Sequence, residues 1–212
     1  MKTRTFASRV SSRAAVIALL AASAAFLAGC GKIKDKVVDG GNAVGKAIEK
    51  VKIDDDPDGE KEYRKGEAYL EDRDFMNAAI CFANAGEKNH GEALFKLALC
   101  YINGKGVPED EAKGFELYRK SGEAGNVKGK FAIVADDLQK HRISNETALR
   151  RLLVLEDEMR VLAESGDHEA EGMYGILIYL KITEADSFEE MMMLSAESER
   201  WIEKAQKSVF IP

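Results

Sequence analysis

The side chains best suited to catalysis or metal binding are few in this sequence and widely spaced. They are three histidines and three cysteines: His90, His141, His168, Cys30, Cys81 and Cys100. A zinc hydrolase needs two histidines one helical turn apart, and a structural metal site needs closely paired cysteines and histidines; neither spacing occurs here. The sequence also lacks a nucleophile elbow, an SxxK motif and a glycine-rich nucleotide fingerprint. We therefore expect no catalytic residue, no metal site and no cofactor.

One acidic stretch resembles half of a calcium-binding loop. Residues 54–59 read Asp-Asp-Asp-Pro-Asp-Gly, with oxygen ligands at positions 1, 3 and 5 and glycine at position 6. The twelfth position, which should be a bidentate glutamate, is Lys65, and Pro57 stiffens position 4. We expect an acidic hinge here, and a calcium-responsive binding module remains an alternative.

The charge of the chain is divided unevenly along its length. Lys and Arg number 31 and Asp and Glu 37 among 212 residues, which gives a net charge of −6. The first 29 residues carry four bases and no acid, a local +4, so the rest carries −10. Nucleic-acid binders gain affinity by neutralising phosphates, so an acidic body of this kind excludes that class of partner.

The N-terminus has the layout of a secretory leader. Four bases precede an apolar run over residues 14–26, which is too short to span a bilayer. The run ends in Leu27, Ala28, Gly29 and Cys30, which resembles a bacterial lipobox. The resemblance implies that residues 1–29 are removed as a lipoprotein signal peptide and that Cys30 carries diacylglycerol and a further acyl chain such as palmitate. An ordinary signal peptide, or an uncleaved anchor with a chance cysteine, is the alternative.

Residues 30–60 are expected to form a tether behind the lipid. Gly31 follows the cysteine where an aspartate would favour inner-membrane retention in enterobacterial lipoproteins, so the resemblance implies the outer membrane, facing the periplasm. Six lysines between positions 32 and 52 could form one face of an amphipathic helix on anionic lipid, but Gly40–Gly41 interrupts the apolar spacing. We favour a solvated linker.

A short phrase recurs beyond residue 60, and it indicates a repeat. The three copies begin with Ala-Gly-Glu at position 85, Ser-Gly-Glu at position 121 and Glu-Ser-Gly at position 164. In each copy a Gly, Asn or Asp follows, and a small residue comes shortly after it. Small residues let two helices approach closely, and Gly-Asn or Gly-Asp pairs end one helix before the next begins. No alternating strand pattern competes with this interpretation.

The first two repeats resemble known families. Residues 61–92 resemble a tetratricopeptide repeat through Gly66, Tyr69, Ala78 and Phe82. Residues 93–128 resemble a Sel1-like repeat, whose signature positions are Ala93, Leu97, Tyr101, Gly104, Gly106, Asp110, Tyr118 and Gly125. In this pattern Gly104 and Gly106 turn the chain out of the first helix, and Asp110 can cap the second.

Two weaker repeats are expected over residues 129–169 and 170–207. In the third repeat, a single second helix is expected to carry the apolar residues Leu149, Leu152, Leu155, Met159 and Leu162. In the fourth, Trp201 occupies the aromatic position after a longer insertion. The predicted fold is all-α, a helix-turn-helix repeat solenoid over residues 61–207 behind the signal peptide and the flexible linker.

The concave face of such a solenoid is the expected binding surface. By tetratricopeptide analogy, the candidate partner-binding residues of the second repeat are Phe95, Leu99, Ile102 and Asn103. Burial of this stripe in the core is the alternative. Residues Met191–Met193 could likewise pack in the core or form a contact patch. Cys81 and Cys100 could form a disulfide or remain as two buried free thiols.

These patterns predict a lipid-anchored, periplasm-facing scaffold or adaptor that binds envelope proteins and is not an enzyme. The resemblance to Sel1-like proteins also leaves a cell-wall-fragment or β-lactam-binding protein or enzyme as an alternative function. No residue identifies the partner.

Overall fold

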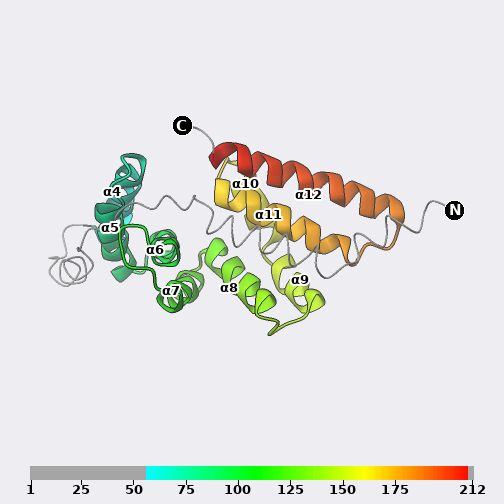
Figure 1. Cartoon of the computed structure of the whole chain (residues 1–212), viewed down its shortest axis with the longest axis horizontal. Helices are drawn as coiled ribbons and strands as arrows, with labels where there is room; N and C mark the ends of the chain where they lie inside the picture. The colour runs from blue at the N-terminus through cyan, green and yellow to red at the C-terminus, as the bar shows by residue number, and fades with distance from the viewer. Residues whose placement is uncertain (1–55, 210–212) are drawn as a thin grey trace. The chain divides into compact units, whose positions relative to one another are not determined.

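A computed structural model describes residues 56–209 of the chain. Within this range the structure has nine helices and no strand (Figure 1). They are α4 (Glu60–Glu71), α5 (Phe75–Glu87), α6 (Gly91–Asn103), α7 (Glu111–Glu123), α8 (Val127–Gln139), α9 (Asn145–Leu153), α10 (Glu156–Glu164), α11 (His168–Ile182) and α12 (Phe188–Val209). The helices pack pairwise in a Sel1-like repeat arrangement, as the sequence predicted.

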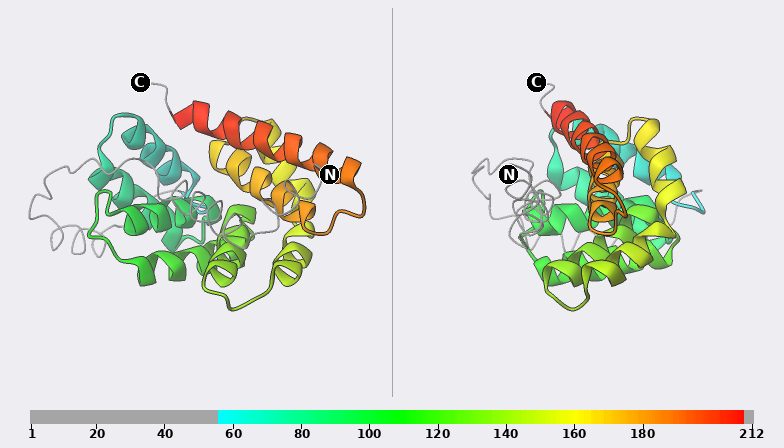
Figure 2. Two further views of the ribbon diagram at one scale, coloured as in Figure 1. Left: turned by 45° about the vertical axis from the view of Figure 1, so that its right-hand side comes forward. Right: turned by 90° about the vertical axis from the view of Figure 1, so that its right-hand side faces the viewer.

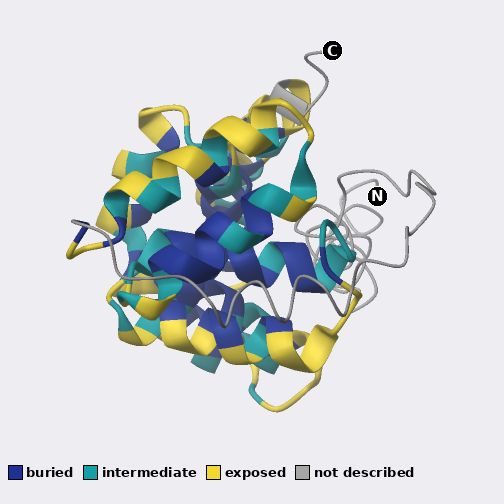
Figure 3. Ribbon diagram, turned by 90° about the vertical axis from the view of Figure 1, so that its left-hand side faces the viewer, coloured by how far each residue is buried: buried dark blue, intermediate teal, exposed yellow. Residues whose placement is uncertain are grey.

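The described residues form two compact units, the first ending at Ile133 and the second beginning at Val134. In the first unit α4 packs on α5, α5 on α6, and α6 on α7. The buried residues of these helices lie on the sides that face one another, and the exposed residues lie on the outer sides (Figure 3). Each helix of this unit is therefore held by its neighbours along the sequence.

The second unit is built around α11. This helix packs against α12 along its length and also contacts α10 and α9 (Figure 2). Eleven of the 15 residues of α11 are buried, and its middle part from Gly172 to Leu180 has no charged side chain, as expected of a helix that is packed on several sides. Gly175 allows α12 to approach, because a Cβ atom there would lie 2.8 Å from Cγ1 of Ile202.

Polar side chains at the helix starts explain where seven of the nine described helices begin. In each case a side-chain acceptor takes a hydrogen bond from the backbone N–H three residues later, which satisfies one of the free donors of the first turn. The capping residues are Asp74, His90, Asp110, Asn126, Ser144, Asp167 and Ser187. The predicted role of Asp110 is confirmed, since its Oδ1 accepts from the N–H of Lys113 at 2.9 Å.

The predicted turn between α6 and α7 is also confirmed. Gly104 ends α6 with φ 63°, and Gly106 follows with φ 73°, both in the left-handed region that glycine tolerates best. Gly106 also lies against the backbone of α5, and a Cβ atom there would fall 2.0 Å from the carbonyl oxygen of Phe75. The glycine therefore provides both the turn and the close approach.

The third repeat differs from the sequence prediction. Its expected second helix is two helices, α9 and α10, separated by Val154 and Leu155. Leu155 precedes α10 with φ −100° and ψ 0°, and its N–H donates to the carbonyl oxygen of Leu152. This tight turn keeps near-helical angles and buries Leu155, so the apolar spacing continues through a break that contains neither glycine nor proline.

The insertion expected in the fourth repeat lengthens its helices instead of forming a long loop. Trp201 of α12 is buried against Tyr174 of α11, with ring centroids 5.4 Å apart. None of the helices between residues 56 and 209 is both long enough and apolar enough to cross a membrane.

Candidate functional site

Most of the repeat-signature residues form the contacts between helices. Ala78, Phe82, Ala93, Leu97, Tyr101 and Tyr118 are buried. Gly66 faces Phe82, and a Cβ atom at Gly66 would lie 2.5 Å from the phenyl ring. Tyr69 differs, since its side chain lies at the surface of α4. Gly125 adopts φ 95° in the turn before α8.

The candidate binding stripe on α6 needs one correction. Phe95 has an exposed fraction of 0%, so it is a core residue and is wrongly placed among the predicted contact residues. Its ring lies 5.2 Å from that of Tyr118 in α7 and 5.1 Å from Nζ of Lys128. Leu99, Ile102 and Asn103 are half-buried and remain near the surface.

The open face of α6 is a mixed stripe of four residues. Glu92, Lys96, Leu99 and Asn103 are spaced by four, three and four positions, so they lie on one side of the helix, and each is partly exposed. We call these four residues the α6 stripe. Ile102 lies beside it and covers Gly114 of α7, where a Cβ atom would fall 2.4 Å from Cγ1 of Ile102. Lys96 was not among the predicted contact residues, although its spacing from Glu92 and Leu99 places it on the same side of the helix.

Polar contacts connect the α6 stripe to α4. Nζ of Lys96 lies 3.9 Å from Oε1 of Glu67, and Nε2 of His90 lies 3.1 Å from Oε2 of Glu60. The ring of Tyr63 stacks on that of His90 with centroids 4.7 Å apart. Hydrogen bonds with His90 and from Arg64 lower the pKa of Glu60, so this end of α4 keeps its negative charge.

An ion pair with the buried Lys128 holds Glu92, the first residue of the α6 stripe. Nζ of Lys128, which is 1% exposed, lies 2.5 Å from Oε1 of Glu92. Nδ2 of Asn126 donates to the second oxygen of Glu92 at 2.6 Å. Both oxygens of Glu92 are therefore engaged, and the start of α6 is fixed to the start of α8.

The half calcium loop lies only partly within the described residues, since Asp54 and Asp55 fall outside them. The carboxylate of Asp56 is buried and accepts hydrogen bonds from the N–H groups of Lys61 and Glu62 at the start of α4, and from Nζ of Lys88. Burial alone would raise the pKa of Asp56, but these three hydrogen bonds outweigh it and lower the pKa to about 2. Asp56 thus serves as the anchor of α4 in this structure.

The two cysteines of the repeats are buried free thiols. Burial raises the pKa of Cys81 to about 11 and that of Cys100 to about 12. Of the two states that the sequence allowed, the structure therefore has the free thiols. Cys30, Leu27, Ala28 and Gly29 lie outside the described residues.

The histidines have roles at helix boundaries. His90 caps α6, with Nδ1 accepting from the N–H of Ala93 at 3.1 Å, and His141 adopts φ 55° in the turn after α8. Nδ1 of His168 lies 3.3 Å from Oε2 of Glu171, a fully buried carboxylate whose other oxygen lies 2.7 Å from Nζ of Lys204. In the part of the chain that the structure describes, no three His, Cys, Asp or Glu side chains are grouped so that they could hold a metal ion.

Comparison with known proteins identifies one part of the chain. No curated protein and no solved structure matches the chain. Residues 91–126 match the family model of the Sel1 repeat, which covers α6, α7 and the turn between them. This all-helical repeat protein therefore contains a Sel1 repeat, a module that typically serves as a protein-interaction scaffold.

Proposed function

We propose that this chain is a lipid-anchored scaffold that binds a protein partner in the bacterial envelope through the α6 stripe. The observation that carries the proposal is the composition of this stripe within the Sel1 repeat. A carboxylate, an ammonium group, an apolar side chain and an amide follow one another along a single face of α6. Such a row can contact a peptide through charges, hydrogen bonds and one apolar anchor at the same time.

The polar groups of the α6 stripe are held in place before a partner arrives. Glu92 is held by Lys128 and Asn126, and Nζ of Lys96 lies near Glu67 of α4. Side chains that are already ordered lose less conformational entropy on binding, so a rigid surface binds more tightly than a mobile one with the same contacts. The mechanism that we propose is binding by a preorganised surface, without catalysis.

The membrane part of the proposal depends on the leader sequence. Leu27, Ala28 and Gly29 precede Cys30 in a lipobox-like order behind a basic start, and Gly31 lacks the aspartate of inner-membrane retention. Several acyl chains give durable anchoring where one gives only marginal binding. We propose attachment to the outer membrane with the repeats in the periplasm, where envelope proteins are the available partners.

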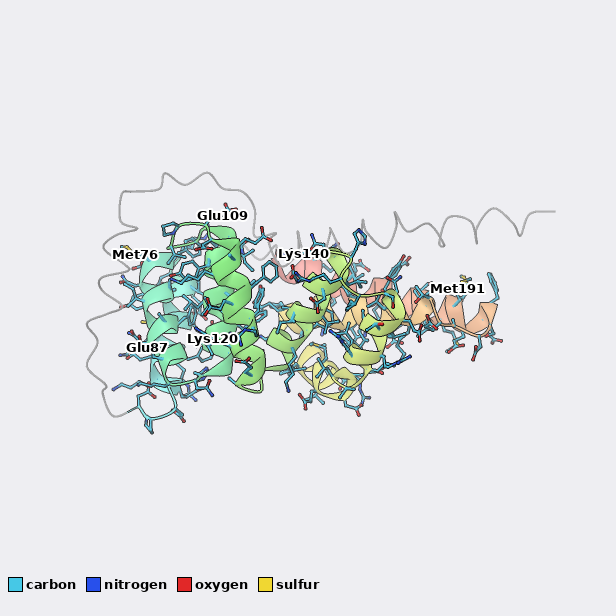
Figure 4. All side chains as sticks on the ribbon, turned by 90° about the horizontal axis from the view of Figure 1, so that it is seen from below. Met76, Glu87, Glu109, Lys120, Lys140 and Met191 are labelled. Carbon is cyan, nitrogen blue, oxygen red and sulfur yellow. The ribbon has the colours of Figure 1, made fainter. Side chains whose placement is uncertain are left out.

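A pair of substitutions tests the binding surface. Leu99→Arg places a charge in the middle of the α6 stripe, and Met76→Arg places the same charge on the exposed side of α5 (Figure 4). Crosslinking pulldown from envelope fractions should recover a partner with wild type and with Met76→Arg, and lose it with Leu99→Arg.

Circular dichroism separates loss of binding from loss of fold. Leu99 is only half-buried, so we expect Leu99→Arg to keep the helical signal of wild type. The proposal fails if Leu99→Arg retains the partner. It also fails if Leu99→Arg and Met76→Arg lose the partner equally while both remain folded, because binding would then not depend on the stripe.

A further inference from the structure

The start of α12 carries an apolar patch that lies in the second unit, apart from the α6 stripe. Phe188 is 69% exposed, Met192 45% and Met193 69%. Together these three residues form what we call the α12 patch. Figure 4 labels Met191, which lies in the same turn of α12. Exposed large apolar side chains that cluster within six residues mark a contact surface more often than those scattered singly.

The helix start that presents the α12 patch is well defined. Ser187 caps it by accepting from the N–H of Glu190 at 3.1 Å, and Oε2 of Glu190 accepts from the N–H of Asp186 at 3.0 Å. Phe188 and Met192 are four residues apart and share one side of the helix. Met191, which is half-buried, lies one turn from Phe188, and Met193 follows Met192 about 100° around the helix.

The charged residues that flank the α12 patch along the chain have one sign. Between Lys181 and Arg200 the sequence contains six acids and no base: Glu184, Asp186, Glu189, Glu190, Glu197 and Glu199. The ammonium group of Lys181 donates to Oε1 of Glu156 at 2.8 Å and is therefore already paired. Methionine side chains are flexible and polarizable, and they adapt to a partner's shape better than branched residues do.

We infer that the α12 patch docks a basic amphipathic helix of another protein, one with apolar residues at helical spacing flanked by Lys or Arg. The apolar side of such a helix would cover Phe188 and Met192, with Met193 at the edge of the contact, and its bases would meet the flanking carboxylates. An anionic membrane surface would be repelled by the same carboxylates. A second copy of this patch would bring like charges together, so charge complementarity favours the basic helix over both.

The test uses a fluorescent peptide of about 18 residues composed of leucine and lysine, with the leucines at amphipathic helical spacing. Fluorescence anisotropy measures its binding to the full chain. We expect the double substitution Phe188→Ser/Met193→Ser to weaken binding at least about tenfold, and Glu184→Gln/Glu189→Gln to weaken it and reduce its dependence on salt. The matched control is Val161→Ser, which removes a side chain that is 60% exposed on α10 of the same unit.

The outcomes separate this inference from the proposed function. Equal weakening by Val161→Ser, no binding of the peptide, or equal binding of a leucine–glutamate peptide would overturn it. Concentration-dependent dimerisation that Phe188→Ser/Met193→Ser abolishes would assign the α12 patch to a second copy and would also overturn it. Leu99→Arg should leave peptide binding unchanged, so the two surfaces can fail independently.

Discussion

Buried charged side chains connect helices in this protein. Lys128 pairs with Glu92 between α8 and α6, and Glu171 pairs with Lys204 between α11 and α12. Moving a charged side chain from water into a protein interior costs roughly several kcal/mol, and a close partner of opposite charge offsets this cost. Lys128 and Glu171 are the buried members of these pairs, so the loss of Glu92 or Lys204 would leave a buried charge with less compensation. Both pairs therefore favour one alignment of the helices that they join.

The two buried thiols allow a prediction at the same scale. Because their pKa values are about 11 and about 12, at most about one in a thousand of either thiol is ionised near pH 8. In a chain with Cys30→Ser, a thiol reagent should therefore modify neither Cys81 nor Cys100 while the protein is folded, and modify both in denaturant. Absorbance of the released chromophore follows the reaction.

The mass of the unreacted chain provides the control for this experiment. It should equal that of two free thiols. A mass lower by two hydrogens, or rapid modification of either cysteine in the folded protein, would contradict the buried free thiols seen in the structure.

At the scale of the helix, the anchor of α4 predicts a response to acid. The pKa of Asp56 is lowered from 3.8 to about 2 in the folded chain, so the ionised carboxylate is the form that favours folding. Its contribution to stability is present above about pH 4 and is lost as the pH falls through the folded value near 2. Asp56→Asn should therefore melt at a lower temperature than wild type at neutral pH, and the difference should shrink as the pH falls.

Melting curves by circular dichroism between neutral pH and about pH 2 measure this effect. The exposed acid Glu109 supplies a control, since Glu109→Gln removes a charge without touching the start of α4. If the gap between wild type and Asp56→Asn stayed constant over this range, the carboxylate of Asp56 would not anchor the helix.

The turn between α6 and α7 predicts a second response at this scale. Gly106→Ala should lower the free energy of unfolding by about 3–4 kcal/mol, because it combines a strained φ with a backbone collision. The added Cβ atom would lie 2.0 Å from the carbonyl oxygen of Phe75. Urea denaturation measures the change.

Gly125→Ala separates the two contributions to this loss. Gly125 also has a positive φ, but a Cβ atom there would meet nothing within 4 Å. The expected cost is that of the left-handed conformation alone, about 1–2 kcal/mol. Equal losses for the two variants would show that the close approach to α5 does not contribute.

At the scale of the whole molecule, the sequence predicted the features that depend on residue type alone. Gly104 and Gly106 favour the left-handed angles of a turn, and Asp110 favours a helix cap, because of their residue types. The recurrence of small residues between helices predicted the all-helical repeat. The break between α9 and α10 could not be predicted, because Val154 and Leu155 continue the helical pattern. Phe95 was wrongly predicted to be a contact residue because neighbouring positions, Phe95 and Lys96, lie on the buried and the open side of α6. Only the packing of Phe95 against Tyr118 distinguishes the two sides.

The proposed anchor would determine how the whole molecule meets a partner. A lipid on Cys30 would confine both the α6 stripe and the α12 patch to a thin layer beside the membrane, where the effective concentration of other envelope proteins is high. Two surfaces of different chemistry on one tethered chain could then hold two partners together. This arrangement depends on acylation at one position.

Metabolic labelling with palmitate tests the anchor. Wild type and Cys100→Ala should both incorporate label, because Cys100 is buried in α6, whereas Cys30→Ala should incorporate none. Mass spectrometry should find that the mature N-terminus is Cys30 carrying acyl mass. A mature chain that retains residues 1–29, or label that persists in Cys30→Ala, would remove the lipid from the proposal. The two proposed surfaces would still be testable in the chain without lipid, since neither includes a residue before position 92.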